Sequence, residues 1–159
     1  MKITLKNLKI AAFLSQETTA FSATVYVDGV KAGTASNDGH GGSNNYYFDD
    51  PKMEAKLEAF AATLPKVKFG DTELSMNLDL VIDDLMQKME EEKRMVRHCK
   101  TKTLFLLEGD DPNQGWRTVK SPYNERVQTF LDGKYGSKVV RILNKEIQGW
   151  SVYSSPYNP

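Results

Sequence analysis

The segment from Asn37 to Tyr47 concentrates the residues of this chain that could do chemistry. It reads Asn-Asp-Gly-His-Gly-Gly-Ser-Asn-Asn-Tyr-Tyr and holds three of the eleven glycines and one of the two histidines. Glycines beside His40 let the backbone approach a ligand closely with its N–H groups exposed. The segment therefore predicts a site for a phosphate-bearing or nucleotide-like ligand, and a surface loop that binds nothing explains it equally well. The ligand-binding residues that we predict here are Asn37, Asp38, Gly39, His40, Gly41, Gly42, Ser43, Asn44 and Tyr46.

No established phosphate-binding signature supports this prediction. The segment has no Gly-Lys-Ser/Thr, and its glycines do not follow the G-x-G-x-x-G spacing of dinucleotide-binding loops. Arg117 and Arg126, in the basic C-terminal third, are the cations that we expect to complete a site for an anionic ligand.

His40 is the residue that could support catalysis, as a general base or a metal ligand, with Asp38, Asp49 and Asp50 close in sequence. The other histidine, His98, lies among cationic residues at a predicted helix end and has a structural explanation there. Sequence signatures of serine hydrolases, zinc proteases and paired-cysteine sites are absent. We therefore expect no catalytic residue, no cofactor and no metal site, and a hydrolase or nuclease based on His40 is the alternative.

Charge is unevenly distributed along a chain whose net charge is zero. Residues 1–92 carry nine Lys and Arg against fifteen Asp and Glu, and residues 93–159 carry twelve against six. Basic residues interleaved with aromatic ones are typical of phosphate-backbone binding. The pI near 6.7 argues against a dedicated nucleic-acid binder. The asymmetry is also what a homo-oligomer or two mutually attractive regions would show.

Local patterns predict a hairpin followed by two helices. A long strand over residues 2–14 changes phase at Asn7, which indicates a bulge, and Asp28-Gly29 joins the strands 21–27 and 30–36 in a tight hairpin. Asp50 is predicted to cap a helix that begins at Pro51 and ends at Pro65. A short hairpin around Gly70-Asp71 and a long helix over residues 77–99 follow.

The last third predicts strands at 103–107, 116–120 and 139–143. A helix between them begins with Ser121 as cap and Pro122 at its first position and extends to Leu131. The order of the predicted strands and helices along the chain indicates an α+β fold, with a mainly antiparallel sheet and about three helices on one face. We expect a single domain over residues 1–143, with two lobes divided between 76 and 101 as the alternative, and a tail over 144–159 that is either docked or disordered.

Hydropathy gives no sign of a membrane segment. No run of about 18 apolar residues is present, and the N-terminus alternates polar and apolar residues instead of forming a signal-peptide core. The single cysteine, Cys99, fits a reducing compartment. These features predict a cytoplasmic protein without a membrane partner.

Residues 2–48 resemble a group of small proteins found in bacteriophages and prophages. The segments that carry this resemblance are Lys2-Ile-Thr-Leu-Lys-Asn-Leu-Lys-Ile-Ala-Ala-Phe, Glu17-Thr-Thr, Val25-Tyr-Val-Asp-Gly29 and Ser36-Asn-Asp-Gly-His-Gly-Gly42. The resemblance implies a phage setting, and thus the host cytoplasm, but no mechanism. Counter-defence is the role that we expect from this setting, because small phage proteins often block host defence by occupying an enzyme or sequestering a signalling nucleotide. We therefore expect a non-enzymatic protein that sequesters an anionic small ligand such as a cyclic nucleotide. A module that inhibits a host protein, or a homo-oligomeric structural module, is the other alternative.

Overall fold

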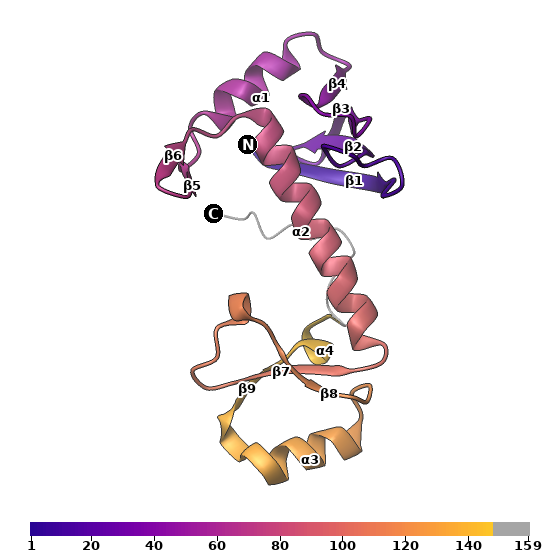
Figure 1. Ribbon diagram of the computed structural model, residues 1–159, viewed down its shortest axis with the longest axis vertical. Helices are drawn as coiled ribbons and strands as arrows, with labels where there is room; N and C mark the ends of the chain where they lie inside the picture. Colours follow the sequence, from indigo (N-terminus) through magenta and orange to yellow (C-terminus); the bar gives the residue numbers. More distant parts are fainter. Residues whose placement is uncertain (148–159) are drawn as a thin grey trace. The chain divides into compact units, whose positions relative to one another are not determined.

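The computed structural model describes residues 1–147 and confirms an α+β fold with antiparallel sheets (Figure 1). Contacts within the chain divide it into two compact units, with the boundary between Met89 and Glu90. Unit 1 comprises residues 1–89 and unit 2 begins at residue 90. The boundary falls inside the longest helix, within the range 76–101 where the sequence suggested an alternative division. Most of the predicted tail, residues 148–159, lies outside the described residues.

Unit 1 is built on a four-stranded sheet of order β1-β2-β3-β4 (Figure 1). Its strands are β1 (Ile3–Ile10), β2 (Phe21–Val27), β3 (Val30–Asn37) and β4 (Asn45–Phe48). The predicted hairpin joins β2 and β3, and Asp28 and Gly29 both have positive φ, 49° and 83°. Positive φ at two successive residues is what a type I′ turn requires.

Strand β4 was not predicted, because the sequence analysis assigned Tyr46 and Tyr47 to a loop. It has only four residues, too few for an alternating pattern, and its pairing with β3 defines it: Ala35 lies opposite Tyr46, and Gly33 opposite Phe48. Gly33 allows this close approach, because a Cβ there would lie 2.1 Å from the carbonyl oxygen of Tyr47.

The predicted bulge in β1 is confirmed. Asn7 has a φ of 54°, and the register with β2 shifts between Lys6 and Lys9. Asn7 is an extra residue in the strand, and it shifts the inward–outward alternation by one position. Leu8 is therefore buried, and Lys9 lies on the same face as Lys6. β3 carries a second irregularity opposite Val25 and Tyr26.

Helices α1 (Met53–Ala61) and α2 (Leu78–Cys99) lie on one side of this sheet (Figure 1). Leu57, Leu78 and Ile82 are fully buried against sheet residues such as Val25 in one core. The hairpin of β5 (Val67–Phe69) and β6 (Thr72–Leu74) connects the helices, as predicted around Gly70-Asp71.

Side chains cap the start of α2 from two directions. Asn77 accepts a hydrogen bond from the N–H of Leu80 at 2.8 Å, and Glu58 of α1 accepts from the N–H of Leu78 at 3.0 Å. The predicted cap of α1 is wrong in detail, since the helix begins at Met53 and the Asp50 carboxylate bonds to the N–H of Lys52 in the preceding turn.

Unit 2 contains a three-stranded sheet with β7 (Thr103–Leu107) between β8 (Arg117–Val119) and β9 (Val139–Ile142). Helix α3 (Glu125–Tyr135) packs through Val127 and Leu131 onto Phe105. The short helix α4 (Leu143–Glu146) and the end of α2 form a second cluster around Leu104. Two 3₁₀ turns, Pro112–Gln114 and Gly136–Lys138, complete the unit.

The predicted cap of α3 is wrong. Ser121 donates its N–H to the carbonyl of Val119 and still belongs to the turn that follows β8. Asn124 is the capping residue, and its side-chain oxygen accepts from the N–H of Val127 at 3.1 Å. The pair Ser121-Pro122 resembles a helix start, but the capping side chain comes from Asn124, three residues later.

Within residues 1–147, no helix has the length and apolar character that a membrane span requires.

The buried side chain of Asn144 ties α4 to the start of β7. Its oxygen accepts from the N–H of Leu104 at 2.9 Å, and its nitrogen donates to the carbonyls of Cys99 and Lys102 at 3.1 and 2.8 Å. We predict that Asn144→Ala lowers the free energy of unfolding by about 1–3 kcal/mol, the cost of leaving a buried polar group without its partner. Urea denaturation followed by circular dichroism measures the change. Asn113→Ala, at an exposed site, is the control, and an equal effect of both variants would contradict this role.

Candidate functional site

Unit 1 contains a polar recess of about 190 Å³ between the glycine-rich loop and the first turns of α2. The loop before β2 contributes Thr18, and the end of β3 and the loop after it contribute Asn37 and Asn44. Asp79 and Asp83, one helical turn apart on α2, form the opposite wall. We call this site the polar recess.

Asn37 organises the loops around the recess. Its side chain is 7% exposed, and its oxygen accepts from the hydroxyl of Thr18 at 2.8 Å and from the N–H of Gly39 at 2.9 Å. Its nitrogen donates to the carbonyl of Gly42 and to the side-chain oxygen of Asn44, at 3.3 and 3.1 Å. A single buried amide therefore holds both loops in place.

Gly39 joins the same two loops through the backbone. Its carbonyl accepts from the N–H groups of Gln16 and Glu17 at 2.9 and 3.1 Å. The N–H of Gly41 donates to the hydroxyl of Thr18 at 3.2 Å, and that of His40 to the Asp38 carboxylate at 3.2 Å. The N–H groups of residues 39, 40 and 41, which we expected to face a ligand, are thus bonded within the loops.

The acidic wall is bonded to the opposite side of the recess. The hydroxyl of Tyr46 donates to Asp79 Oδ1 at 2.6 Å, and the amide of Asn44 donates to Asp83 Oδ1 at 3.3 Å. Burial and the bond to Asp79 raise the pKa of Tyr46, so its hydroxyl stays a donor. Burial raises the pKa of Asp83; the bond from Asn44 opposes this effect and the charge of Asp79 adds to it. Asp83 is therefore a carboxylate whose negative charge is only partly compensated.

The structure brings only some of the predicted site residues to the recess. Asn37, Gly42 and Asn44 line it, and Tyr46 reaches Asp79. Asp38, His40 and Ser43 are exposed on the loop. The ring of Tyr46 is stacked on Phe48 with centroids 5.8 Å apart, so that face is not open to a ligand.

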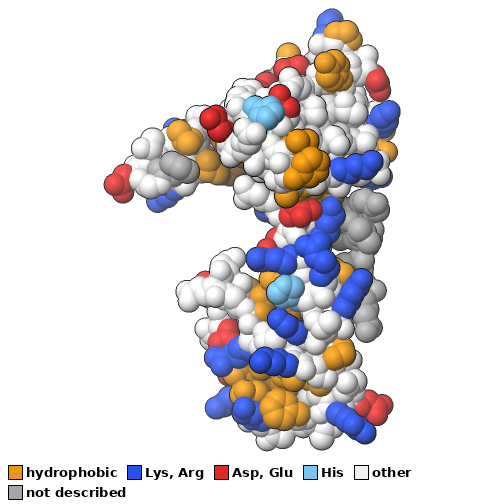
Figure 2. Space-filling model, turned by 45° about the vertical axis from the view of Figure 1, so that its right-hand side comes forward, with side chains coloured by type: hydrophobic (Ala, Val, Ile, Leu, Met, Phe, Trp, Pro, Cys, Tyr) orange, Lys and Arg blue, Asp and Glu red, His pale blue; other side chains and the backbone are white. Residues whose placement is uncertain are grey.

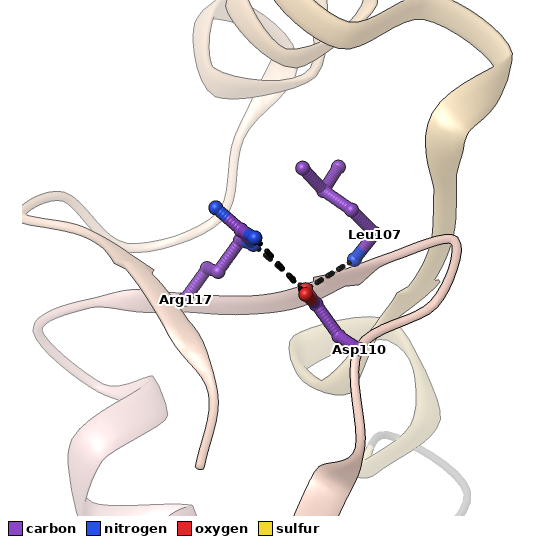
Figure 3. A network of polar contacts seen from close by, with 3 residues as sticks. All are labelled: Leu107, Asp110 and Arg117. Atoms are coloured by element: carbon purple, nitrogen blue, oxygen red, sulfur yellow. Dashed lines mark hydrogen bonds and ion pairs between the residues drawn. The ribbon is translucent and has the colours of Figure 1, made fainter. Parts of the chain in front are cut away.

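Arg117 and Arg126 belong to unit 2. Figure 3 shows the Asp110 carboxylate between Arg117 and the N–H of Leu107, with Arg117 Nε and Nη2 at 2.7 and 3.0 Å from its oxygens. These bonds, that of Arg117 first, lower the pKa of Asp110 to about 2. Arg126 is exposed on α3. On the face that Figure 2 shows, Lys and Arg side chains gather over unit 2 and the C-terminal half of α2.

Sequence reasoning missed Thr18, Asp79 and Asp83. Acidic residues are common at any helix N-terminus because they complement the helix dipole, so the two aspartates do not stand out in the sequence. Their spacing of four residues was the available signal, because it places both on one face of α2. In the described part of the chain, no group of three or more His, Cys, Asp or Glu residues could hold a metal ion.

The loop glycines provide a matched pair of variants. Gly39 and Gly42 both have positive φ, 89° and 87°, but a Cβ at Gly39 would lie 2.5 Å from the carbonyl oxygen of Leu14, whereas Gly42 has open space. We predict that Gly42→Ala costs about 1–2 kcal/mol, the price of a left-handed alanine, and that Gly39→Ala costs clearly more. Urea denaturation compares them, and equal losses would show that the two loops do not pack as described.

The raised pKa of Asp83 predicts a pH dependence of stability. The folded protein binds this proton more tightly than the unfolded chain, so the contribution to stability is present below the unfolded pKa, about 3.9, and is lost as pH rises through the raised folded pKa. We expect Asp83→Asn to remove that decline. Denaturation between pH 4 and 8 measures it, with Asp71→Asn, at the exposed β5–β6 turn, as the control. Parallel profiles of Asp83→Asn and the parent protein would contradict the assignment.

Comparison with known proteins gives no match: no family model matches the chain, and no significant similarity to a curated protein or to a solved structure is found. The resemblance of residues 2–48 to phage proteins, and the cytoplasmic setting that it implies, therefore stay predictions. What the chain could bind has to be argued from the polar recess.

Proposed function

We propose that this chain is a non-enzymatic binding protein and that the polar recess binds a small ligand through a cationic group, a protonated amine or a guanidinium. The observation that carries the proposal is that Asp79 and Asp83 of α2 line one cavity with the glycine-rich loop, where Tyr46 donates to Asp79 and the Asn44 amide donates to Asp83. Neither half of this arrangement forms a site alone.

Charge favours a cation. Among the described residues, those that line the recess include two carboxylates and no Lys, Arg or His. A unit positive charge about 4 Å from a carboxylate gains about 4 kcal/mol at the effective dielectric constant typical near a protein surface, before desolvation is subtracted. Burial and Asp79 make the charge of Asp83 unfavourable in the free protein, and a bound cation would relieve that effect.

Hydrogen-bonding capacity supports the same ligand. Among the described residues, the bonds to Asp79 and Asp83 from across the recess use one oxygen, Oδ1, of each carboxylate. Ionised carboxylates can only accept hydrogen bonds, so the further bonds that the two aspartates can accept suit a ligand rich in donors. The volume of 190 Å³ lies below the range of about 300–1,000 Å³ typical of drug-sized ligands. A cationic head group with a short chain fits this size.

The anionic ligand that the sequence predicts remains a prediction. Its cations, Arg117 and Arg126, belong to unit 2, and Arg117 is engaged by Asp110. Host-protein binding and homo-oligomer formation also remain predictions. In the phage setting that the resemblance implies, binding without turnover would act by sequestering the ligand.

Calorimetric titration of the full chain tests the cation. Agmatine and spermidine are the cationic probes, and AMP and cyclic AMP are the anionic ones. We expect at least one amine to bind, and Asp83→Asn and Asp79→Asn each to weaken it about tenfold or more, within the Coulomb energy available. Affinity should also fall as pH drops through the raised pKa of Asp83, because protonation removes the charge.

Asp71→Asn is the matched control, since it removes one exposed carboxylate from unit 1 outside the recess. An equal loss in that variant would indicate general electrostatics and reject the site. Binding of cyclic AMP without binding of either amine would reject the cation and support the anionic ligand. No response to any probe would also reject the proposal.

A further inference from the structure

The sheet of unit 1 has a second face, on the side away from α1 and α2. Strand pairing arranges its residues in three rows that cross the sheet, and we call this surface the outer face. Apart from Thr, Ser and Asn side chains, the outer face carries Lys6, Lys9, Lys31, Tyr26 and Tyr47. None of the paired residues in these rows is Asp or Glu.

The two strand irregularities place lysines on this face. In β3, Gly33 pairs with Val25 on the inner side, and an uninterrupted strand would put Lys31 on that side too. The bulge at Ala32 brings Lys31 opposite Tyr26 instead. The bulge at Asn7 does the same for Lys9, which pairs with Ser22. The outer face is therefore basic because of backbone geometry as well as composition.

The lysines of the outer face contrast with the net negative charge of unit 1. Residues 1–89 contain nine lysines, no arginine and twelve Asp and Glu, a balance of −3. Three of the nine lysines share the outer face without an acidic residue among its pairs. Lys6 Nζ lies 4.1 Å above the ring centroid of Tyr26, which holds its charge over the sheet. The charge of the face is complementary to an anionic partner.

Tyr47 adds an open aromatic surface. It lies in the same row as Lys6, Thr24 and Thr34, and it is 75% exposed. Tyr26 lies in the neighbouring row, and Lys6 Nζ covers its ring at 4.1 Å from the centroid, so Tyr47 is the ring that a base can reach. A base can stack on this ring only when one of its faces is free, as in a single strand.

We infer that the outer face binds single-stranded nucleic acid, with a base stacked on Tyr47 and phosphates at Lys6, Lys9 and Lys31. Aromatic rings and cations on an open sheet are how many single-strand binders hold bases and backbone. Lysines attract an acidic protein as well as nucleic acid. The exposed ring of Tyr47 favours nucleic acid, because it offers a surface on which a base can stack. The pI of 6.7 led us to expect nucleic acid to be an unlikely partner, but a whole-chain average does not describe one face. This inference does not depend on the polar recess.

Fluorescence anisotropy with the full chain and labelled 12-nucleotide single strands, DNA and RNA, tests the inference, with a DNA duplex and polyglutamate for comparison. We expect single strands to bind more tightly than the duplex. The logarithm of the affinity should fall with the logarithm of salt concentration with a slope near −2, about 0.7 for each of three phosphate contacts. Tyr47→Ala should weaken binding about tenfold, and Tyr47→Phe should retain it.

The triple variant Lys6→Ala, Lys9→Ala, Lys31→Ala should abolish binding, while replacement of the same lysines by arginine should preserve it. The matched control is Lys52→Ala, Lys66→Ala, Lys68→Ala, which removes three lysines of unit 1 outside the outer face. Absence of single-strand binding, an equal loss in the control, or no effect of Tyr47→Ala would each overturn the inference. Polyglutamate that binds as tightly as DNA and is insensitive to Tyr47→Ala would assign the face to an acidic protein instead.

Discussion

The structure around the polar recess depends on the hydrogen bonds of one buried amide, that of Asn37. Its four bonds join the loop before β2 to the glycine-rich loop. Leaving a buried polar group without a partner costs about 1–3 kcal/mol, so the loops are held in the arrangement that satisfies all four. Asn44 accepts one of these bonds and itself donates to Asp83, which links the loops to α2. Glycines in this loop serve the turn geometry and the close contact with Leu14 more than the exposure of N–H groups to a ligand.

One sheet separates two surfaces of opposite charge in unit 1. The helix-covered side carries the recess with Asp79 and Asp83, and the outer face carries three lysines. The net charge and the pI of the whole chain sum the charges of both surfaces, so neither value reveals the acidic recess or the basic face. Because exposed charges are screened beyond about 8–10 Å at physiological salt, each surface acts on its own contacts. A net charge of zero for the whole chain is therefore compatible with surfaces of opposite charge in unit 1.

In unit 2, much of the basic character has a structural role. Arg117 forms a two-bond pair with Asp110, and Arg141 pairs with Glu146 at 2.7 and 2.9 Å while its guanidinium lies 5.2 Å from the centroid of Trp116. Exposed pairs of this kind contribute little to stability, at most about 1 kcal/mol. They do orient the cations toward neighbours within the unit. The alternation of basic and aromatic residues in this part of the chain thus reflects local cation–π and ion-pair contacts.

The sequence by itself determined the features that arise from neighbouring residues: the turn at Asp28-Gly29, the bulge at Asn7, the hairpin at Gly70-Asp71 and the long helix α2. Each follows from local backbone preferences or a repeating apolar pattern. Tertiary structure decided the rest. β4 forms by pairing with β3, where Gly33 admits the backbone of Tyr47, and Asp79 and Asp83 meet Tyr46 and Asn44 only because α2 packs on the sheet. These contacts join residues separated by up to 39 positions, and no local pattern encodes such a meeting.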